Sequence, residues 1–338
     1  MNRLNRPTIK DVAREANVSI ATVSRILNNG DGYSQKTKQH VLQTIEKLGY
    51  SPNAMARGLI NKESNTIGVL FPDVSGLISA ELLQGIEEAA HLRGFSVIVC
   101  KTDSDGHKTL DILRLLQEKQ VEGIIFTSQL LTKEFAAFIE KMAVPVITVS
   151  SYSEEKAIPS VRVDDELASY DAVRYLLKHN HTEIGMISGP PTDLLAGAPR
   201  IRGYKRAITE AGLPWVETKV AWDSGFYFEH GQMAFNKLFD RHPQLTAIFA
   251  ASDELAVSAI SCAHERGIQV PDELSVIGYD GTKLARMSLP ALTVISQGFE
   301  AMGKEAADLL FQSIESGNIS PGATVQHTLI ERKSVRKK

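Results

Sequence analysis

The chain has 338 residues, of which 43% are hydrophobic and 23% are charged, and its formal net charge at pH 7 is −3. No apolar run approaches the roughly 18 residues of a membrane span, and the first residues, MNRLNRPTIKDV, lack the apolar core of a signal peptide. These features exclude a membrane-spanning class, and we expect a cytoplasmic protein. Its two cysteines, Cys100 and Cys262, lack metal-site spacing and a disulfide framework, so reduced core thiols are expected.

The first predicted elements are two short helices joined by a tight corner, in residues 8–28, TIKDVAREANVSIATVSRILN. Thr8 and Asp11 have the spacing of a capping box, in which the carboxylate returns to the cap amide. Asn17 falls at the corner, where a residue that tolerates positive φ is needed. Ser19 then offers an N-cap for the second helix. The pattern is typical of a helix-turn-helix, which lays its second helix in the major groove of DNA.

The predicted second helix has one face for packing and one for reading. Its apolar side, Val23 with Ile26 or Leu27, turns toward the first helix. The opposite side carries Ile20, Ala21 and Arg25, and a positive helix N-terminus with an arginine two turns inside suits a DNA groove. A generic helical hairpin is the alternative.

A third helix is predicted from a Ser34 cap to about Leu48, ended by Gly49, and its apolar residues recur at helical spacing. The following segment, 51–64, begins SPNAMARGL and allows only about two helical turns. Because two isolated turns are unstable in water, we expect this helix to form only when something holds it.

Charge is distributed unevenly along the chain. Residues 1–62 contain ten Lys and Arg against four Asp and Glu, a balance of +6, whereas the other 276 residues contain 27 against 36, a balance of −9. A basic head on an acidic body is typical of a head that meets phosphates, although solvated helix surfaces carry charge too.

The segments TIKDVAREANVS, TVSRILN and SPNAMARGL resemble the lactose and galactose repressor family of bacterial transcription regulators. The resemblance implies base reading by Ile20, Ala21 and Arg25, and a hinge helix in 51–64 that pairs with its twin on operator DNA. It also implies a leucine wedge in the minor groove, which would bend a flexible base step. The remaining DNA contacts that it implies are Thr22, Ser24, Asn28, Ser34, Thr37, Asn53, Ala56 and the wedge Leu59.

The body beyond residue 64 alternates Val- and Ile-rich runs with amphipathic helices, which predicts two parallel sheets covered on both faces. With the resemblance, the expected fold is a small all-α helix-turn-helix head and hinge helix joined to a two-lobed, periplasmic-binding-protein-like α/β core with doubly wound sheets. The strand LTVISQ is expected to return the chain to the first lobe, and a last strand near 325–331 to the second. The expected divisions are 1–50 for the head, 51–64 for the hinge, 65–163 with 292–324 for the N-terminal lobe, and 164–291 with 325–338 for the C-terminal lobe.

Ligands of open parallel sheets lie at the carboxyl ends of the strands, so the two lobes should share one cleft. The resemblance places a small effector there, a sugar or sugar derivative, which the arginine fork and a carboxylate would orient. The arginine is Arg202 and the carboxylate is that of Asp280. On spacing alone, Arg202 could instead form a structural ion pair, and Asp280 could be a strand-end cap. The effector contacts that the resemblance implies are Gly76, Ser150, Arg202, Phe226, Ser252, Asp280 and Gln297.

The expected pocket departs from the family pattern at two positions. The family often has Asn at the position of Ser252 and frequently has Asp at the position of Ser150. SPNAMARGL and the Ile20-Ala21 pair also resemble the catabolite control branch, whose co-effector is a phosphorylated carrier protein. Global catabolite control is therefore an alternative to local repression of carbohydrate-utilisation genes.

The sequence lacks the motifs of other function classes. We find no dinucleotide, phosphate-loop or nucleophile-elbow sequence, so no enzyme and no cofactor are expected. A solvated cap suits the His179–His181 cluster better than a metal site. A transporter's solute-binding protein shares the two-lobed core, but the basic head disfavours it. We expect a homodimer on a near-palindromic operator, with no membrane contact.

Overall fold

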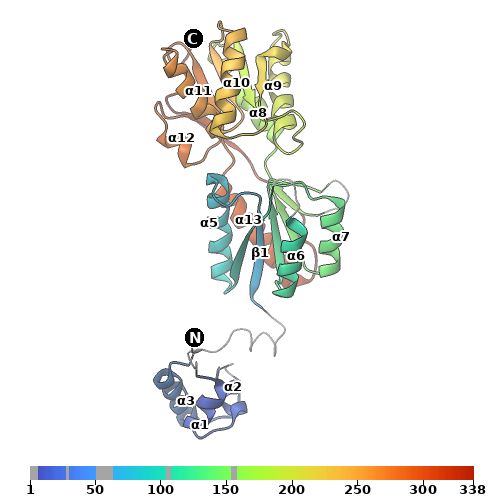
Figure 1. Cartoon of the computed structure of the whole chain (residues 1–338), viewed down its shortest axis with the longest axis vertical. Coiled ribbons are helices and arrows are strands. Elements are labelled where there is room, and N and C mark those ends of the chain that lie inside the picture. The colour runs from blue at the N-terminus through green and yellow to red at the C-terminus, as the bar shows by residue number, and fades with distance from the viewer. Residues whose placement is uncertain (1–6, 28–29, 51–63, 104–107, 154–157) are drawn as a thin grey trace. The chain divides into compact units, whose positions relative to one another are not determined.

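The computed structural model describes residues 7–27, 30–50, 64–103, 108–153 and 158–338 (Figure 1). The chain divides into two compact units, Met1–Ser64 and Asn65–Lys338. No helix within the described ranges is long and apolar enough to cross a membrane.

The first unit contains the predicted three helices, α1 (Ile9–Glu15), α2 (Ile20–Leu27) and α3 (Gln35–Leu48). They enclose a small core of Val12, Ala13, Ala16, Val23, Ile26 and Val41. Such a core is enough to hold two helices at a fixed angle, which a helix-turn-helix requires.

The predicted local signals of this unit are confirmed. The backbone N–H of Thr8 donates to the Asp11 carboxylate at 2.9 Å, and Asn17 has φ 51°. Ser19 accepts from the N–H of Thr22 at 3.1 Å, and Ser34 caps α3 in the same way, with Gly49 left-handed at the other end. The predicted hinge helix in 51–64, with Asn53, Ala56 and Leu59, falls almost entirely outside the described residues, as does Asn28.

The second unit contains two lobes, each built on a six-stranded sheet. Lobe 1 has the strand order β11-β5-β4-β3-β1-β2, with all neighbours parallel. Its elements are β1 (Thr66–Phe71), α5 (Leu77–Leu92), β2 (Ser96–Lys101), α6 (Thr109–Glu118), β3 (Gly123–Thr127), α7 (Lys133–Met142), β4 (Val146–Val149), β5 (Ser160–Arg162), α13 (Phe299–Ser316) and β11 (Ala323–Thr324).

The two faces of this sheet are covered by different helices, because alternate side chains of each strand point opposite ways. Ile67, Val69 and Phe71 of β1 pack with α5 and α13, whereas Leu70 packs with α6 and α7 (Figure 1). The doubly wound arrangement expected from the alternating pattern is confirmed in this lobe.

Lobe 2 has the strand order β12-β10-β9-β8-β6-β7, in which β12 alone runs antiparallel to its neighbour. Its elements are α8 (Asp165–Lys178), β6 (Ile184–Ser188), α9 (Gly197–Glu210), the 3₁₀ turn η1 (Glu217–Lys219), β7 (Val220–Trp222), α10 (Phe228–Arg241), β8 (Ala247–Ala250), α11 (Asp253–Glu265), β9 (Ser275–Asp280), α12 (Lys283–Met287), β10 (Thr293–Ser296) and β12 (Thr328–Ile330).

One predicted crossing lies at a different place in the chain. The LTVISQ strand, β10, pairs with β9 in lobe 2, with Val294 opposite Gly278, so the expected return to lobe 1 at residue 292 is wrong. The return comes after Ser296. The last strand predicted near 325–331 is confirmed as β12 in lobe 2. A further short strand, β11, precedes it in lobe 1, where the N–H of Val325 donates to the carbonyl of Arg162. An apolar run predicts a strand but does not say which sheet its backbone joins.

The His179–His181 cluster has a structural role. The His181 side chain is buried and contacts the hydroxyl of Thr246 at 3.0 Å and the carbonyl of Arg336 at 3.1 Å. Burial lowers the pKa of His181. The solvated cap expected from the sequence is therefore wrong for His181, which fixes the C-terminal segment onto lobe 2.

Candidate functional site

The outer face of α2 is the predicted reading surface of the first unit. Val23 and Ile26 are buried against the other helices, whereas Ile20, Ala21 and Arg25 are exposed. The Ile20 side chain is 45% exposed on this face. The structure thus presents an apolar pair and one arginine together, as contact with thymine methyl groups and a guanine edge would require.

Hydroxyl groups surround the N-termini of α2 and α3. The Ser19 and Thr22 hydroxyls lie 2.9 Å apart, and those of Ser34 and Thr37 lie 2.8 Å apart. Ser24, the other predicted phosphate contact, is half-buried on α2. Hydroxyls and free N–H groups at helix N-termini are donors that suit phosphate oxygens. These phosphate contacts remain predictions.

The second unit contains a cavity of about 330 Å³ between its lobes, within the usual range for a small-molecule site. It lies at the carboxyl ends of the strands and at helix N-termini, as the sheet rule predicts. Its walls include Pro72, Asp73 and Gly76–Ser79, Ser128, Ser150, Asp165, Asp193, Leu195, Ala196, Arg200, Gly225–Tyr227, Ser252–Glu254, Asp280, Thr282, Gln297 and Phe299.

Most of the predicted effector positions line this cavity, and one does not. The cavity brings together Gly76, Ser150, Phe226, Ser252, Asp280 and Gln297. Arg202 lies elsewhere, with its side chain 59% exposed and its Nε 2.7 Å from Glu166 Oε2. The structure therefore contradicts the placement of Arg202 in the cleft, and the alternative, an ion pair, is what it forms.

Arg200 occupies the place predicted for Arg202. Two residues along a helix turn the side chain by about 200°, which exchanges the outer face for the inner one. Arg200 lies three residues before Gly203, where α9 packs so closely on α8 that a Cβ would come within 2.2 Å of the Glu166 carbonyl oxygen. The buried stripe of Arg200, Gly203, Tyr204 and Ala207 was the sequence signal that could have identified it.

Arg200 is the centre of a buried polar cluster. Its Nε donates to Asp165 Oδ1 at 2.8 Å, and its Nη1 donates to the carbonyl of Ala251 and lies 3.8 Å from Asp280 Oδ1. The guanidinium carbon is 4.0 Å from the centre of the Tyr279 ring, whose hydroxyl donates to the same Asp165 oxygen. The cluster joins β9, α8 and α9 directly beneath the cavity.

Asp280 is held in an unusual backbone conformation at the end of β9. Its φ of 101° is rare for a residue with a side chain, and such strain is found at functional sites. Gln297 Nε2 donates to Asp280 Oδ1 at 2.8 Å. Burial raises the pKa of Asp280 to about 6, against the opposing effect of Arg200. Two predicted effector residues thus bond to each other and form one acceptor surface.

Asp253 is a cavity residue at a predicted strand end that the resemblance did not include among the effector contacts. Its side chain is 2% exposed, and its Oδ2 accepts from the N–H of Thr282 at 2.7 Å and from the Thr282 hydroxyl at 2.8 Å. Its Oδ1 has no hydrogen-bond partner among the described residues. Burial first, and then the charge of Asp280, raise the pKa of Asp253 to about 8.

The raised pKa makes the stability of this unit depend on pH. The folded unit holds a proton on Asp253 that the unfolded chain releases near pH 4, so this contribution is lost as pH rises from about 4 through about 8. Asp253→Asn should therefore lose less stability between pH 6 and 8 than wild type does, the difference reaching at most about 1.4 kcal/mol per pH unit. Urea unfolding at several pH values measures it, with the exposed Asp111→Asn as control. Parallel curves for wild type and Asp253→Asn would contradict the shift.

Ser252 and Ser150 have limited capacity for a ligand. The Ser252 hydroxyl donates to the Phe226 carbonyl at 2.9 Å and accepts from the N–H of Leu255, where it caps α11. Ser150 has φ 48° and contacts the Met302 sulfur at 3.4 Å. The cavity groups with more capacity for a ligand are the acidic residues, Gln297 and the apolar face of Phe226.

Comparison with known proteins agrees with both units. Residues 8–53 match the model described as bacterial regulatory proteins, lacI family, and residues 173–335 match a periplasmic binding protein-like domain. Catabolite control protein A of Priestia megaterium is 41% identical over 303 residues, which cover 90% of this chain and 91% of that protein. The chain belongs to the lacI family. The repressor CytR of Escherichia coli is 34% identical to this chain, and the match covers 97% of this chain and 96% of CytR.

Solved structures extend the match to the whole fold of this lacI-family protein. The lac repressor dimer bound to operator and the anti-inducer ONPF aligns with a TM-score of 0.88 at 25% identity, over 98% of this chain and all of that chain. The CelR–cellobiose complex aligns with a TM-score of 0.74 at 28% identity, over 97% and 100%. The lacI-family protein is thus a helix-turn-helix transcriptional regulator with a two-lobed core.

Proposed function

We propose that the protein represses carbohydrate-utilisation genes by binding a near-palindromic operator as a dimer, under the control of a sugar or sugar derivative between its lobes. The observation that carries this proposal is the 330 Å³ cavity, which draws Gly76 and Ser150 from lobe 1 and Phe226 and Asp280 from lobe 2 into one site. A ligand that contacts both lobes can change DNA affinity by as much as its affinities for the two conformations differ.

The chemistry of the cavity supports a polyhydroxylated ligand. Asp280 offers acceptor oxygens, and Phe226 offers an apolar face of the kind that packs against a sugar ring. Two similar structures contain sugars, the CelR complex with cellobiose and an Enterococcus faecium regulator with bound ribose, 27% identical with a TM-score of 0.72. The proposal is tested by measuring operator affinity of the full chain with and without such sugars.

Catabolite control with a phosphorylated carrier protein is the second candidate function. The 41% identity to catabolite control protein A favours it. A pull-down with the phosphorylated and unphosphorylated carrier separates the two, because a co-effector role requires preference for the phosphorylated form. In either case we infer that the protein acts by binding rather than by catalysis, and in the cytoplasm, where its operator lies.

Base reading is proposed to depend chiefly on Arg25, with Ile20 and Ala21. Arg25→Ala should relax base preference at one operator position, with a loss there of about 1–3 kcal/mol of discrimination. Binding-site selection from a random duplex library measures the preference. Arg14→Ala is the matched control, because it removes the same charge from α1, where the side chain is 79% exposed and pairs with Asp11. Unchanged base preference with uniformly weaker binding would assign Arg25 to phosphate.

The route from effector to DNA is proposed to pass through residues 51–64. In this proposal the paired hinge helices stabilise each other on the operator, Leu59 wedges the central base step, and Asn53 and Ala56 contact the DNA beside it. A coupling of about 1–3 kcal/mol between the effector and operator sites would give regulation from several-fold to a few hundred-fold.

A further inference from the structure

The charges around the cavity are strongly unequal. Six of its lining residues are acidic, namely Asp73, Asp165, Asp193, Asp253, Glu254 and Asp280. Among the described lining residues Arg200 is the single cation. A site that binds phosphate or carboxylate normally offers several cationic or N–H donors. The side chains that line this cavity are instead mostly acidic.

The one arginine is already bound within the protein. Arg200 donates to Asp165 and to the carbonyl of Ala251, and its plane lies over the Tyr279 ring. Its side chain is 8% exposed. Two of its donors are thus used within the protein, and its positive charge is balanced by Asp165 at 2.8 Å and Asp280 at 3.8 Å. Arg200 therefore serves to hold the cavity wall.

The carboxylates facing the opening come from both lobes. Asp73 follows β1 in lobe 1, and Glu254 is in the first turn of α11 in lobe 2, where it accepts from the N–H of Phe228 at 3.1 Å. Burial raises the pKa of Glu254, and the charges of Glu229 and Asp73 raise it further.

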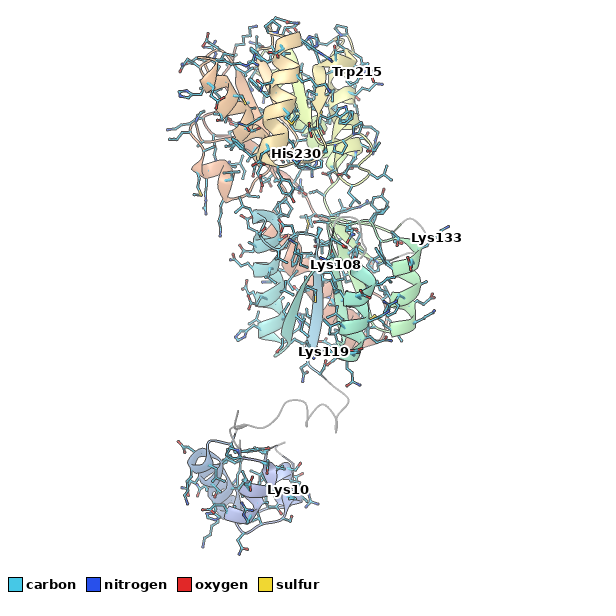
Figure 2. All side chains as sticks on the ribbon, viewed as in Figure 1. Lys10, Lys108, Lys119, Lys133, Trp215 and His230 are labelled. Carbon is cyan, nitrogen blue, oxygen red and sulfur yellow. The ribbon has the colours of Figure 1, made fainter. Side chains whose placement is uncertain are left out.

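Two basic side chains lie near this opening without lining the cavity. The ammonium of Lys101 is 3.7 Å from Asp73 Oδ1, and its side chain is 60% exposed. His230 lies in the first turn of α10, beside the lining residue Gly225 (Figure 2). Among the described lining residues, the acids therefore still outnumber Arg200.

We propose that the cavity selects ligands by charge, accepting uncharged sugars and rejecting their phosphorylated forms, with Glu254 as a specificity-determining residue. The proposal rests on the proposed function and narrows its effector class. It follows from the acidic lining of the cavity. Sugar hydroxyls can donate to carboxylate oxygens such as those of Asp73 and Glu254, whereas a phosphate group brings only acceptor oxygens and further negative charge.

Matched pairs of sugars test the selection directly. Titration calorimetry of the full chain at one fixed pH would compare D-ribose with ribose 5-phosphate, D-glucose with glucose 6-phosphate, and cellobiose with its 6-phosphate. The neutral member of any pair that binds should have a dissociation constant at least tenfold lower than that of its phosphate. Equal or tighter binding of the phosphate would overturn charge selection while leaving a sugar-controlled regulator intact. Binding of no member would contradict the proposed function, and this inference with it.

A substitution in the lining tests the part assigned to Glu254. Glu254→Gln retains an oxygen that can accept from the N–H of Phe228, but it removes one negative charge. It should narrow the affinity gap between a sugar and its phosphate several-fold, chiefly by improving binding of the phosphate. Glu265→Gln is the matched control, because Glu265 is an exposed acid at the other end of α11 that does not line the cavity. An equal effect of both variants, or none, would overturn the assignment to Glu254.

Discussion

Arg200→Leu should lower the free energy of unfolding of the two-lobed unit by about 3–5 kcal/mol, the usual cost of removing one partner of a buried ion pair. Asp165 would lose its charged partner, Asp280 its nearby positive charge, and the carbonyl of Ala251 a donor. The side chains that border the ligand would thereby lose their fixed positions. Urea unfolding followed by circular dichroism measures the loss.

Arg202→Leu is the matched control for this experiment. It removes the same side chain two residues along α9, where the arginine pairs with Glu166 on the surface. Exposed pairs contribute little, so a change within about 0.5 kcal/mol is expected. Similar losses for the two variants would contradict the assignment of the cluster to Arg200.

Gly85→Ala should destabilise lobe 1 by about 3 kcal/mol, at the upper end for overpacking of a core. A Cβ at Gly85 would lie 1.9 Å from the carbonyl oxygen of Glu300 in α13, and one at Gly303 would lie 2.2 Å from that of Leu82 in α5. The obstacle is backbone rather than a flexible side chain, so α5 and α13 must separate. Urea unfolding measures the effect.

The neighbouring Gln84→Ala is its control, since Gln84 is exposed on the same helix. Because α5 and α13 carry Leu77, Ile78 and Phe299 into the cavity wall, Gly85→Ala should also weaken ligand binding. A stability equal to that of Gln84→Ala would show that the helices do not cross as closely as described.

Local signals allowed the head to be predicted well. The Thr8–Asp11 box, the left-handed corner at Asn17 and the caps at Ser19 and Ser34 each depend on a few adjacent residues. Interactions of this range are visible in sequence, because cap and corner residues are selected by backbone geometry alone. The alternating strands and helices of the core follow from hydrophobic period in the same way.

The remaining features depend on contacts between distant segments. LTVISQ reads as a strand, but only its pairing with β9 places it in lobe 2. Arg200 and Arg202 are equally plausible as residue types, and the packing of Gly203 on α8 decides which one is inside. Asp253 lies at a predicted strand end, but an acidic residue in the first turn of a helix is common, and only the structure shows that it is buried beside Asp280.

The most direct test of ligand control is the operator dissociation constant of the full chain, measured by fluorescence anisotropy with and without a saturating sugar. The duplex would come from binding-site selection, and calorimetry with the same protein would establish that the sugar occupies its site. The predicted result is a change of about 5–150-fold, the range of ordinary allosteric coupling. An unchanged dissociation constant with the cavity saturated would contradict control of DNA binding by a ligand between the lobes.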